Sequence, residues 1–161
     1  MIKFSIRALV VEGQLGGVRP GDTPDSVRDR LGPPSDLMAG IGGTEIWRYG
    51  NFELFIDGDL VYTLYHDWLI DLEADGEREI DPWILGTAEA PSYDAVVQRL
   101  TAEQVPFIPG RDRQNRRMLE IPTGARLLFE IDADTGVESW TVIQVVHPDF
   151  ASGFTPDEST D

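Results

Sequence analysis

The chain has 161 residues, and its 29 acidic and 13 basic side chains give it a formal net charge of −16 at pH 7. The absence of cysteine from the sequence excludes disulfides, thiolate metal sites, a cysteine nucleophile and lipid attachment at a cysteine. So acidic a chain would repel the phosphate backbone of a nucleic acid and attract a basic protein partner.

Residues 2–11 are expected to form an N-terminal strand, because Phe4 and Ile6 alternate with Ser5 and Arg7 before a short apolar run begins. This run is too short for the apolar core of a signal peptide, and Arg7 interrupts it. No later segment approaches the roughly 18 consecutive apolar residues of a membrane-spanning helix. We therefore expect a cytoplasmic protein that does not bind a membrane.

A short helix is predicted to begin at Pro24 and to end at Leu31. Thr23 is a favourable N-cap, proline suits the first helical position, and Gly32 lies just beyond the last turn. Val27 and Leu31 are four residues apart, so they share one face of the helix. That apolar face is expected to pack on a sheet.

Residues 44–67 are predicted to form a meander of three antiparallel strands, the most clearly patterned part of the chain. In the middle strand Leu54 alternates with Glu53 and Phe55, as expected of a strand with one buried face. The strand before it contains Trp47 and ends at a turn signal of glycine and asparagine.

The turn after the middle strand decides how it pairs with the next one. A three-residue loop at residues 57–59, with Gly58 in a left-handed conformation, would place Leu54 opposite Tyr62 on the buried face. A two-residue turn would instead mix the apolar and polar faces. The alternation therefore predicts the three-residue loop, with Tyr62 packed beneath the helix.

An acidic connector over residues 68–86 is expected to separate this half from a second one. Ser92 is a favourable N-cap for a helix that runs from Tyr93 to about Glu103 and turns Val96 inward. Three further strands are predicted at residues 118–121, 125–132 and 137–146.

The two halves resemble each other, because residues 25–31 and 94–100 match at four of seven positions. The sequence therefore predicts an α+β fold of two similar units, each a short helix packed on an antiparallel β-meander. The first unit would span residues 1–83, and the second, residues 84–148, would pack with it as one globular body. Residues 149–161 are expected to form a flexible acidic tail.

A resemblance to a known family is carried by these positions of the first half: Gly13-x-Leu15, Gly21-Asp22-Thr23, Val27, Leu31-Gly32-x-Pro34, Trp47-x-Tyr49 and Phe55. Over about residues 13–66 this pattern resembles the SmpA/OmlA outer-membrane lipoproteins and proteins like the beta-lactamase inhibitory protein, in which the helix-plus-meander unit is doubled in tandem. The chain lacks the lipidation cysteine of the former and the disulfide cysteines of the latter. The resemblance implies protein binding rather than catalysis, and a cytoplasmic bacterial relative of this shape would suit an immunity protein of a toxin system.

No catalytic or metal-binding signature is recognisable, so we expect neither enzymatic activity nor a cofactor. His66 and His147 lie at predicted strand ends, where solvation is expected. Residues 132–136 resemble part of a calcium loop, but Ile143 occupies the position of its last acidic ligand, and a hairpin turn is predicted instead. A stand-alone adaptor or assembly factor of the SmpA/OmlA type and a small acidic enzyme are the alternatives to an inhibitor.

One basic island interrupts the acidic chain, and it contains Arg111, Arg113, Arg116 and Arg117. It is predicted to be a solvated loop that balances nearby acids. Contact with a partner or an anion is an alternative, and RNA binding is opposed by the overall charge.

Residues 53–81 carry ten acids and one arginine, a net charge of −9, beside aromatic residues that point outward in the predicted meander. Aromatic anchors and acidic steering groups together are typical of a surface that binds a basic protein. The sequence leaves open whether Phe55 and Tyr65 are exposed or covered by the second half. The predicted partner-binding residues are Glu53, Phe55, Asp57, Tyr65, Asp67, Trp68, Asp71, Glu73 and Asp75. The expected function is inhibition of a basic partner, such as a toxin.

Overall fold

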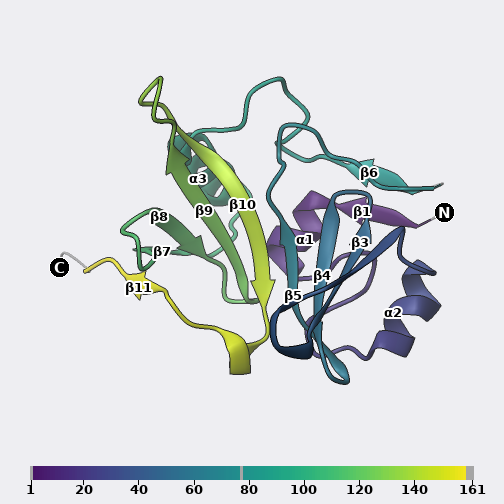
Figure 1. Ribbon diagram of the computed structural model, residues 1–161. Coiled ribbons are helices and arrows are strands. Elements are labelled where there is room, and N and C mark those ends of the chain that lie inside the picture. The colour runs from purple at the N-terminus through teal and green to yellow at the C-terminus, as the bar shows by residue number, and fades with distance from the viewer. Residues whose placement is uncertain (1, 77, 159–161) are drawn as a thin grey trace.

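One large antiparallel sheet runs through the protein (Figure 1). The computed structural model describes residues 2–76 and 78–158. In this part of the chain the sheet contains, in spatial order, nine strands: β11 (Thr155–Pro156), β7 (Ile108–Arg111), β8 (Arg117–Glu120), β9 (Ala125–Ile131), β10 (Glu138–Val146), β5 (Leu60–His66), β4 (Phe52–Asp57), β3 (Glu45–Tyr49) and β2 (Asp36–Ala39). A separate parallel pair joins β1 (Lys3–Ser5) to β6 (Glu79–Asp81).

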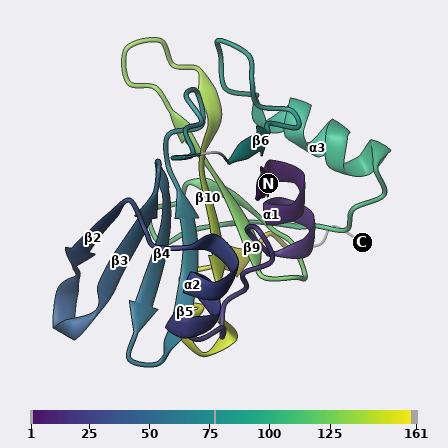
Figure 2. The ribbon, with the colours of Figure 1, turned by 90° about the vertical axis from the view of Figure 1, so that its right-hand side faces the viewer.

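The α-helices of the described chain pack on one face of this sheet, and they are α1 (Ile6–Glu12), α2 (Pro24–Leu31) and α3 (Tyr93–Ala102). Figure 2 shows α1 and α3 on the same side of the strands. Between helices and sheet lies one hydrophobic core, which includes Val27 of α2, Val96 of α3 and the strand residues Leu54 and Val145. The protein is therefore α+β, as predicted.

Both predicted helices are confirmed, and their first turns show why they begin where they do. The Thr23 hydroxyl accepts a hydrogen bond from the Ser26 N–H at 3.2 Å, and the Ser92 hydroxyl accepts one from the Ala95 N–H at 3.2 Å. Each N-cap thereby satisfies a backbone donor that has no partner inside the helix.

The predicted N-terminal strand over residues 2–11 is wrong beyond Ser5, because the chain turns there into α1. The Ser5 side chain accepts a hydrogen bond from the Ala8 N–H at 3.1 Å, and Gly13 ends the helix with a φ of +66°. The Ser5 cap thus begins the helix and the left-handed glycine ends it. The apolar run between them forms the buried face of α1, which includes Leu9.

The hairpin between β4 and β5 has a two-residue turn, so the predicted three-residue loop is wrong. Asp57 pairs with Leu60, and Gly58 adopts a φ of +60° at the first position of the turn. A bulge at Tyr62 then restores the alternation, because Tyr62 pairs with no residue of β4 and Leu54 stays on the buried face. Tyr62 is consequently turned away from the core, contrary to the prediction.

The strands predicted at residues 118–121, 125–132 and 137–146 are confirmed as β8, β9 and β10. The sequence did not indicate β2 or β7, and β7 contains a proline and a glycine, which are depleted in strands. The predicted flexible tail is wrong up to residue 158, because a turn, η2 (Pro148–Phe150), and β11 attach this segment to the fold. Residues 159–161 of that tail lie outside the described residues.

Part of the order of helices and strands recurs along the chain, although β1, α1 and β6 have no counterpart. Helix α2 precedes β2, β3, β4 and β5, and α3 precedes β7, β8, β9 and β10. The two groups of strands meet where β5 pairs with β10, from His66 opposite Ile143 to Thr63 opposite Val146. Because they lie edge to edge in one sheet, neither group of strands covers the other.

Candidate functional site

The face of the sheet opposite the helices, which we call the open face, carries none of the described α-helices (Figure 2). One row of neighbouring residues across it consists of Arg48, Glu53, Tyr65, Gln144, Arg126 and Glu120. The next row contains Ile46, Phe55, Thr63 and Val146. An antiparallel sheet with helices on one side thus presents its other side to a partner.

Aromatic side chains form a connected group on the open face, and we call Phe55, Tyr62, Tyr65 and Phe150 the aromatic cluster. Phe55 stacks on Tyr65 with their ring centroids 5.4 Å apart, and it also contacts Tyr62 at 6.0 Å. Tyr62 lies 5.0 Å from Phe150 of the C-terminal segment. Phe55 and Tyr65 are half-buried. The strands of the second half lie beside these two rings rather than over them, so that each ring is partly exposed and partly covered by its neighbours.

Charged residues on the open face are paired with one another. Arg48 Nε lies 3.2 Å from Glu53 Oε1, and Arg126 Nε lies 3.0 Å from Glu120 Oε2. Arg126 is only 8% exposed, and its Nη1 also donates to the Ser152 carbonyl at 2.6 Å. Burial raises the pKa of the Glu53 carboxyl, and Arg48 opposes that effect. Since opposite charges are paired here, the open face lacks the strong acidity of the chain as a whole.

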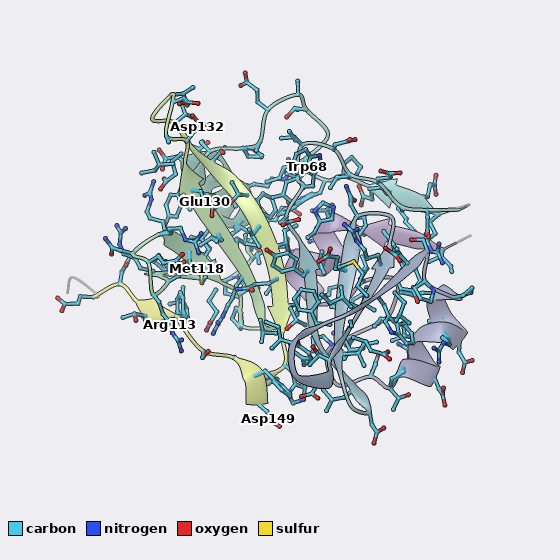
Figure 3. The ribbon with its side chains drawn as sticks, viewed as in Figure 1. Trp68, Arg113, Met118, Glu130, Asp132 and Asp149 are labelled. Atoms are coloured by element: carbon cyan, nitrogen blue, oxygen red, sulfur yellow. The ribbon has the colours of Figure 1, made fainter. Side chains whose placement is uncertain are left out.

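A hollow of ≈ 390 Å³ opens on the same face, next to the aromatic cluster. Met118 and Leu128 are buried beneath it, whereas Arg116 and Glu130 lie on its rim (Figure 3 labels Met118 and Glu130). Arg116 forms an ion pair with Glu130, and its Nε donates to Asp112 Oδ2 at 2.7 Å. An apolar base with a polar rim suits an apolar side chain inserted by a partner.

The nine residues predicted to bind a partner do not form one surface. Glu53, Phe55 and Tyr65 lie together on the open face. Asp57 is exposed at the turn before β5, and Asp67 is exposed just beyond its other end. At about 3.3 Å per residue, the length of β5 separates these two ends by roughly 20 Å.

The remaining predicted residues belong to the loop after β5, and they are Trp68, Asp71, Glu73 and Asp75 (Figure 3 labels Trp68). This loop is attached to the turn between β3 and β4, because Asn51 Nδ2 donates to the Asp71 carbonyl at 2.6 Å and Asn51 Oδ1 accepts from the Glu73 N–H at 2.9 Å. Asp75 forms an ion pair with Arg78. Hydrogen bonds from the Asn51 side chain to the backbone of the loop thus hold the loop in place. The side chains of Trp68, Asp71 and Glu73 are exposed.

The prediction that both histidines are solvated is wrong for His66, which is fully buried. Its Nε2 lies 2.9 Å from Asn51 Oδ1, and its Nδ1 accepts a hydrogen bond from the Trp68 N–H at 3.1 Å. Burial lowers the pKa of His66 to about 4, so the ring is neutral at pH 7. His147 is half-buried, and its Nδ1 accepts from the Asp149 N–H at 3.1 Å.

The arginine-rich segment between β7 and β8 balances neighbouring groups, as predicted. Arg117 Nε donates to Glu138 Oε1 at 2.9 Å, and its guanidinium lies 3.7 Å from the centre of the Tyr93 ring. Arg111 Nη1 donates to the Asn115 carbonyl at 2.9 Å. These contacts tie the segment to the β9–β10 hairpin and to α3.

The predicted hairpin turn at residues 132–136 is confirmed. Asp132 Oδ1 accepts hydrogen bonds from the N–H groups of Thr135 at 2.8 Å and Asp134 at 2.9 Å, which lower the pKa of the Asp132 carboxyl. Across residues 2–76 and 78–158, no group of three or more histidine or carboxylate side chains is arranged to hold a metal ion. The same stretch of chain contains no helix of the length and apolarity needed to cross a membrane.

Comparisons of the chain with models of protein families, with curated proteins and with solved structures found no match. The resemblance to the SmpA/OmlA lipoproteins and to proteins like the beta-lactamase inhibitory protein therefore stays a prediction. The open face, the aromatic cluster and the hollow beside it are the features from which a function is inferred.

Proposed function

We propose that this protein is a cytoplasmic inhibitor that binds a basic protein through the open face, as an immunity protein binds its toxin. The observation that carries the proposal is the aromatic cluster on a sheet face that the described helices leave uncovered. Aromatic side chains anchor protein interfaces because they bury a large area and lose few rotatable bonds. Within the cluster, Phe150 and Tyr62 also hold the C-terminal segment, whereas the exposed parts of Phe55 and Tyr65 on this solvent-facing surface are what a partner would cover.

The proposal includes an architecture of two similar units, each a helix followed by a meander. Its support is the repeated element order, in which α2 and α3 each precede four antiparallel strands. The matched residues 25–31 and 94–100 include most of α2 and most of α3. Two such units, joined where β5 pairs with β10, would form one broad surface rather than two separate ones.

The acidic residues have a separate role in this proposal. Asp67, Asp71 and Glu73 are exposed near one end of the open face and are not needed for the stacking of its aromatic rings. Charges at the rim of an interface speed the encounter with an oppositely charged partner more than they slow its release. We therefore assign affinity to the aromatic cluster and steering to the acidic loop after β5.

We further propose that the protein is not an enzyme. The carboxylates of Glu53 and Glu120 on the open face are each paired with an arginine, and His66 is buried away from solvent. A general acid or base needs access to substrate as well as a suitable pKa. These arrangements favour binding over proton transfer.

The proposal is tested with Tyr65→Ala and Phe55→Ala, and with Val137→Ala as a control at an exposed position in the β9–β10 hairpin. A basic protein captured from the native host by the unchanged chain is purified, and its inhibition and dissociation constants are measured. Each aromatic variant should weaken binding by about 2 kcal/mol or more, roughly 30-fold, and the control should not. Equal inhibition by all three folded variants would exclude the open face as the binding site.

A further inference from the structure

The two edges of the nine-stranded sheet differ in how they are protected. At one edge β11 contains Pro156, which has no N–H to offer another strand. At the other edge β2 exposes Leu37 (49%) and Met38 (38%), and the adjoining turn exposes Ile41 (95%). An exposed, apolar edge strand without proline or lysine is a ready template for a further strand.

The pairing of β2 with β3 shows which backbone groups face outward. The Gly40 N–H donates to the Thr44 carbonyl at 2.7 Å, so Gly40 directs its backbone groups toward β3. Hydrogen-bonded and non-hydrogen-bonded positions alternate along an antiparallel pair, and Met38 therefore bonds to β3 as well. Leu37 and Ala39 consequently direct their N–H and C=O groups toward the free edge.

We propose that β2 pairs in antiparallel fashion with β2 of a second copy of this chain, about a two-fold axis perpendicular to the sheet. Leu37 lies opposite Ala39 of the partner subunit, and Met38 lies opposite Met38 of the partner subunit. The outward Ala39 N–H and the outward carbonyls of Leu37 and Ala39 then gain partners across the interface, and the Leu37 N–H exchanges its 2.9 Å hydrogen bond to Asp36 Oδ1 for one to the backbone of the partner subunit. The apolar side chains of both strands become each other's neighbours.

This register is favoured over a shift that places Leu37 opposite Leu37 of the partner subunit. The shifted pairing needs Ser35 to extend the strand, but the Ser35 N–H already donates to the Arg48 carbonyl at 2.8 Å. In the proposed register Asp36 lies opposite Gly40 of the partner subunit, so that no two acids face each other. The dimer is also closed. Each chain uses its β2 edge for the pairing, and the opposite edge, formed by β11 with Pro156, cannot pair with a third chain in the same way.

The net charge of −16 per chain opposes this association, but the acids are not concentrated at β2. Asp36 is next to Arg48 across the β2–β3 ladder. The acidic loop after β5 approaches the start of β2, because the Asn51 N–H donates to the Glu73 carbonyl and the neighbouring Gly50 N–H donates to Ser35 Oγ, so part of its charge adds to the repulsion. Salt screens the remaining repulsion and should strengthen the dimer. Met38 shares a row with Ile46 and Phe55, so the dimer joins two open faces into one continuous surface.

Single-cysteine variants test the pairing, since the chain has no cysteine of its own. Residues in a non-hydrogen-bonded pair have Cα atoms about 4.5 Å apart, within the range of a disulfide. Met38→Cys should therefore form a disulfide-linked dimer faster than Leu37→Cys in oxidised glutathione. The control Ile131→Cys, at an exposed site on another strand, reports random collision.

Sedimentation equilibrium of the unchanged chain and of Ala39→Pro provides the second measurement. Proline at residue 39 removes an outward N–H from each subunit and should weaken dimerisation by about tenfold or more. The unchanged chain should dimerise more tightly as salt is raised. A chain that stays monomeric at high salt, or a Met38→Cys rate equal to that of Ile131→Cys or below that of Leu37→Cys, would overturn the proposed dimer.

Discussion

Arg7 of α1 donates a 2.7 Å hydrogen bond to Glu103, the residue at the C-terminal end of α3. The other carboxylate oxygen of Glu103 accepts from Arg99 Nε at 2.6 Å and from Trp83 Nε1 at 2.7 Å. One carboxylate thus connects both helices and the segment between β6 and α3. The hydrogen bond from Arg7 is the main reason why the pKa of Glu103 is lowered to about 2, and those from Arg99 and Trp83 add to it.

Glu103→Gln should lower the free energy of unfolding at pH 7 by about 1 kcal/mol, a modest loss because Arg7 and Arg99 are partly exposed and screened. A lowered carboxyl pKa stabilises the fold above its ordinary value of 4.5, and this contribution disappears as pH falls toward 2. Urea unfolding at several pH values measures the difference, with the exposed Glu79→Gln as control. An unchanged difference between pH 7 and pH 2 would contradict the prediction.

The burial of neutral His66 predicts a second pH dependence. Its pKa is about 4 in the folded protein and 6.5 when solvated, so the unfolded chain binds the proton more tightly. The fold therefore has its full stability above pH 6.5 and loses up to about 1.4 kcal/mol per pH unit between pH 6.5 and 4. In His66→Gln, which cannot take up a proton, the stability should depend less on pH over this interval. Thermal unfolding in buffers from pH 7 to pH 5 would reveal a parallel decline in both proteins if the prediction is wrong.

Leu54→Ala should destabilise the fold by about 2–5 kcal/mol, because the Leu54 side chain is fully buried between the sheet and the helices and its loss leaves a cavity. The matched control is Leu37→Ala, at the exposed edge strand, which should change the free energy of unfolding by less than about 0.5 kcal/mol. Denaturant unfolding of both variants measures the contrast. Equal losses would show that β4 does not face the core.

Charge reversal of the acidic loop tests the steering role. Asp71→Lys, Glu73→Lys and Asp75→Lys combined should slow association with a basic partner and flatten its dependence on salt, with little change in dissociation. The exposed side chains of Asp71 and Glu73 make few contacts that folding requires, whereas Asp75 also loses its ion pair with Arg78. Stopped-flow or surface-binding kinetics at two salt concentrations separate the rates. Faster dissociation with unchanged association would assign the loop to the contact surface instead.

Local signals allowed part of this fold to be predicted from sequence. Thr23 and Ser92 cap their helices through bonds to residues only three positions away, so the sequence itself contains the relevant partners. The pairing of β4 with β5 could not be predicted from alternation alone, because it also depends on the length of the turn and on a bulge. The predicted loop placed Leu54 opposite Tyr62, whereas the two-residue turn followed by the bulge at Tyr62 places it opposite Leu64, so the apolar faces stay together despite the shorter turn. Gly58-Asp59, with glycine at the first of the two loop positions, is typical of two-residue turns and was the signal that favoured the correct one.

The candidate site was predicted less completely than the fold. The outward position of Phe55 and Tyr65 follows from alternation alone, and the structure confirms it. Phe150 joins the same cluster from the opposite half of the chain, and no sequence pattern relates it to Tyr62. The burial of His66 depends likewise on Asn51 and on a loop that folds back over it, which are tertiary contacts.

The junction between β5 and β10 has a consequence for the order of folding. It pairs His66 with Ile143, two residues far apart in the chain, whereas the hairpins on either side connect near neighbours. Contacts between distant residues form slowly because a long loop must close first. We expect each group of strands to assemble before the junction does. A newly made chain would then pass through a stage in which β5 and β10 both present unpaired backbone, and where crowded chains could join wrongly by exchanging halves.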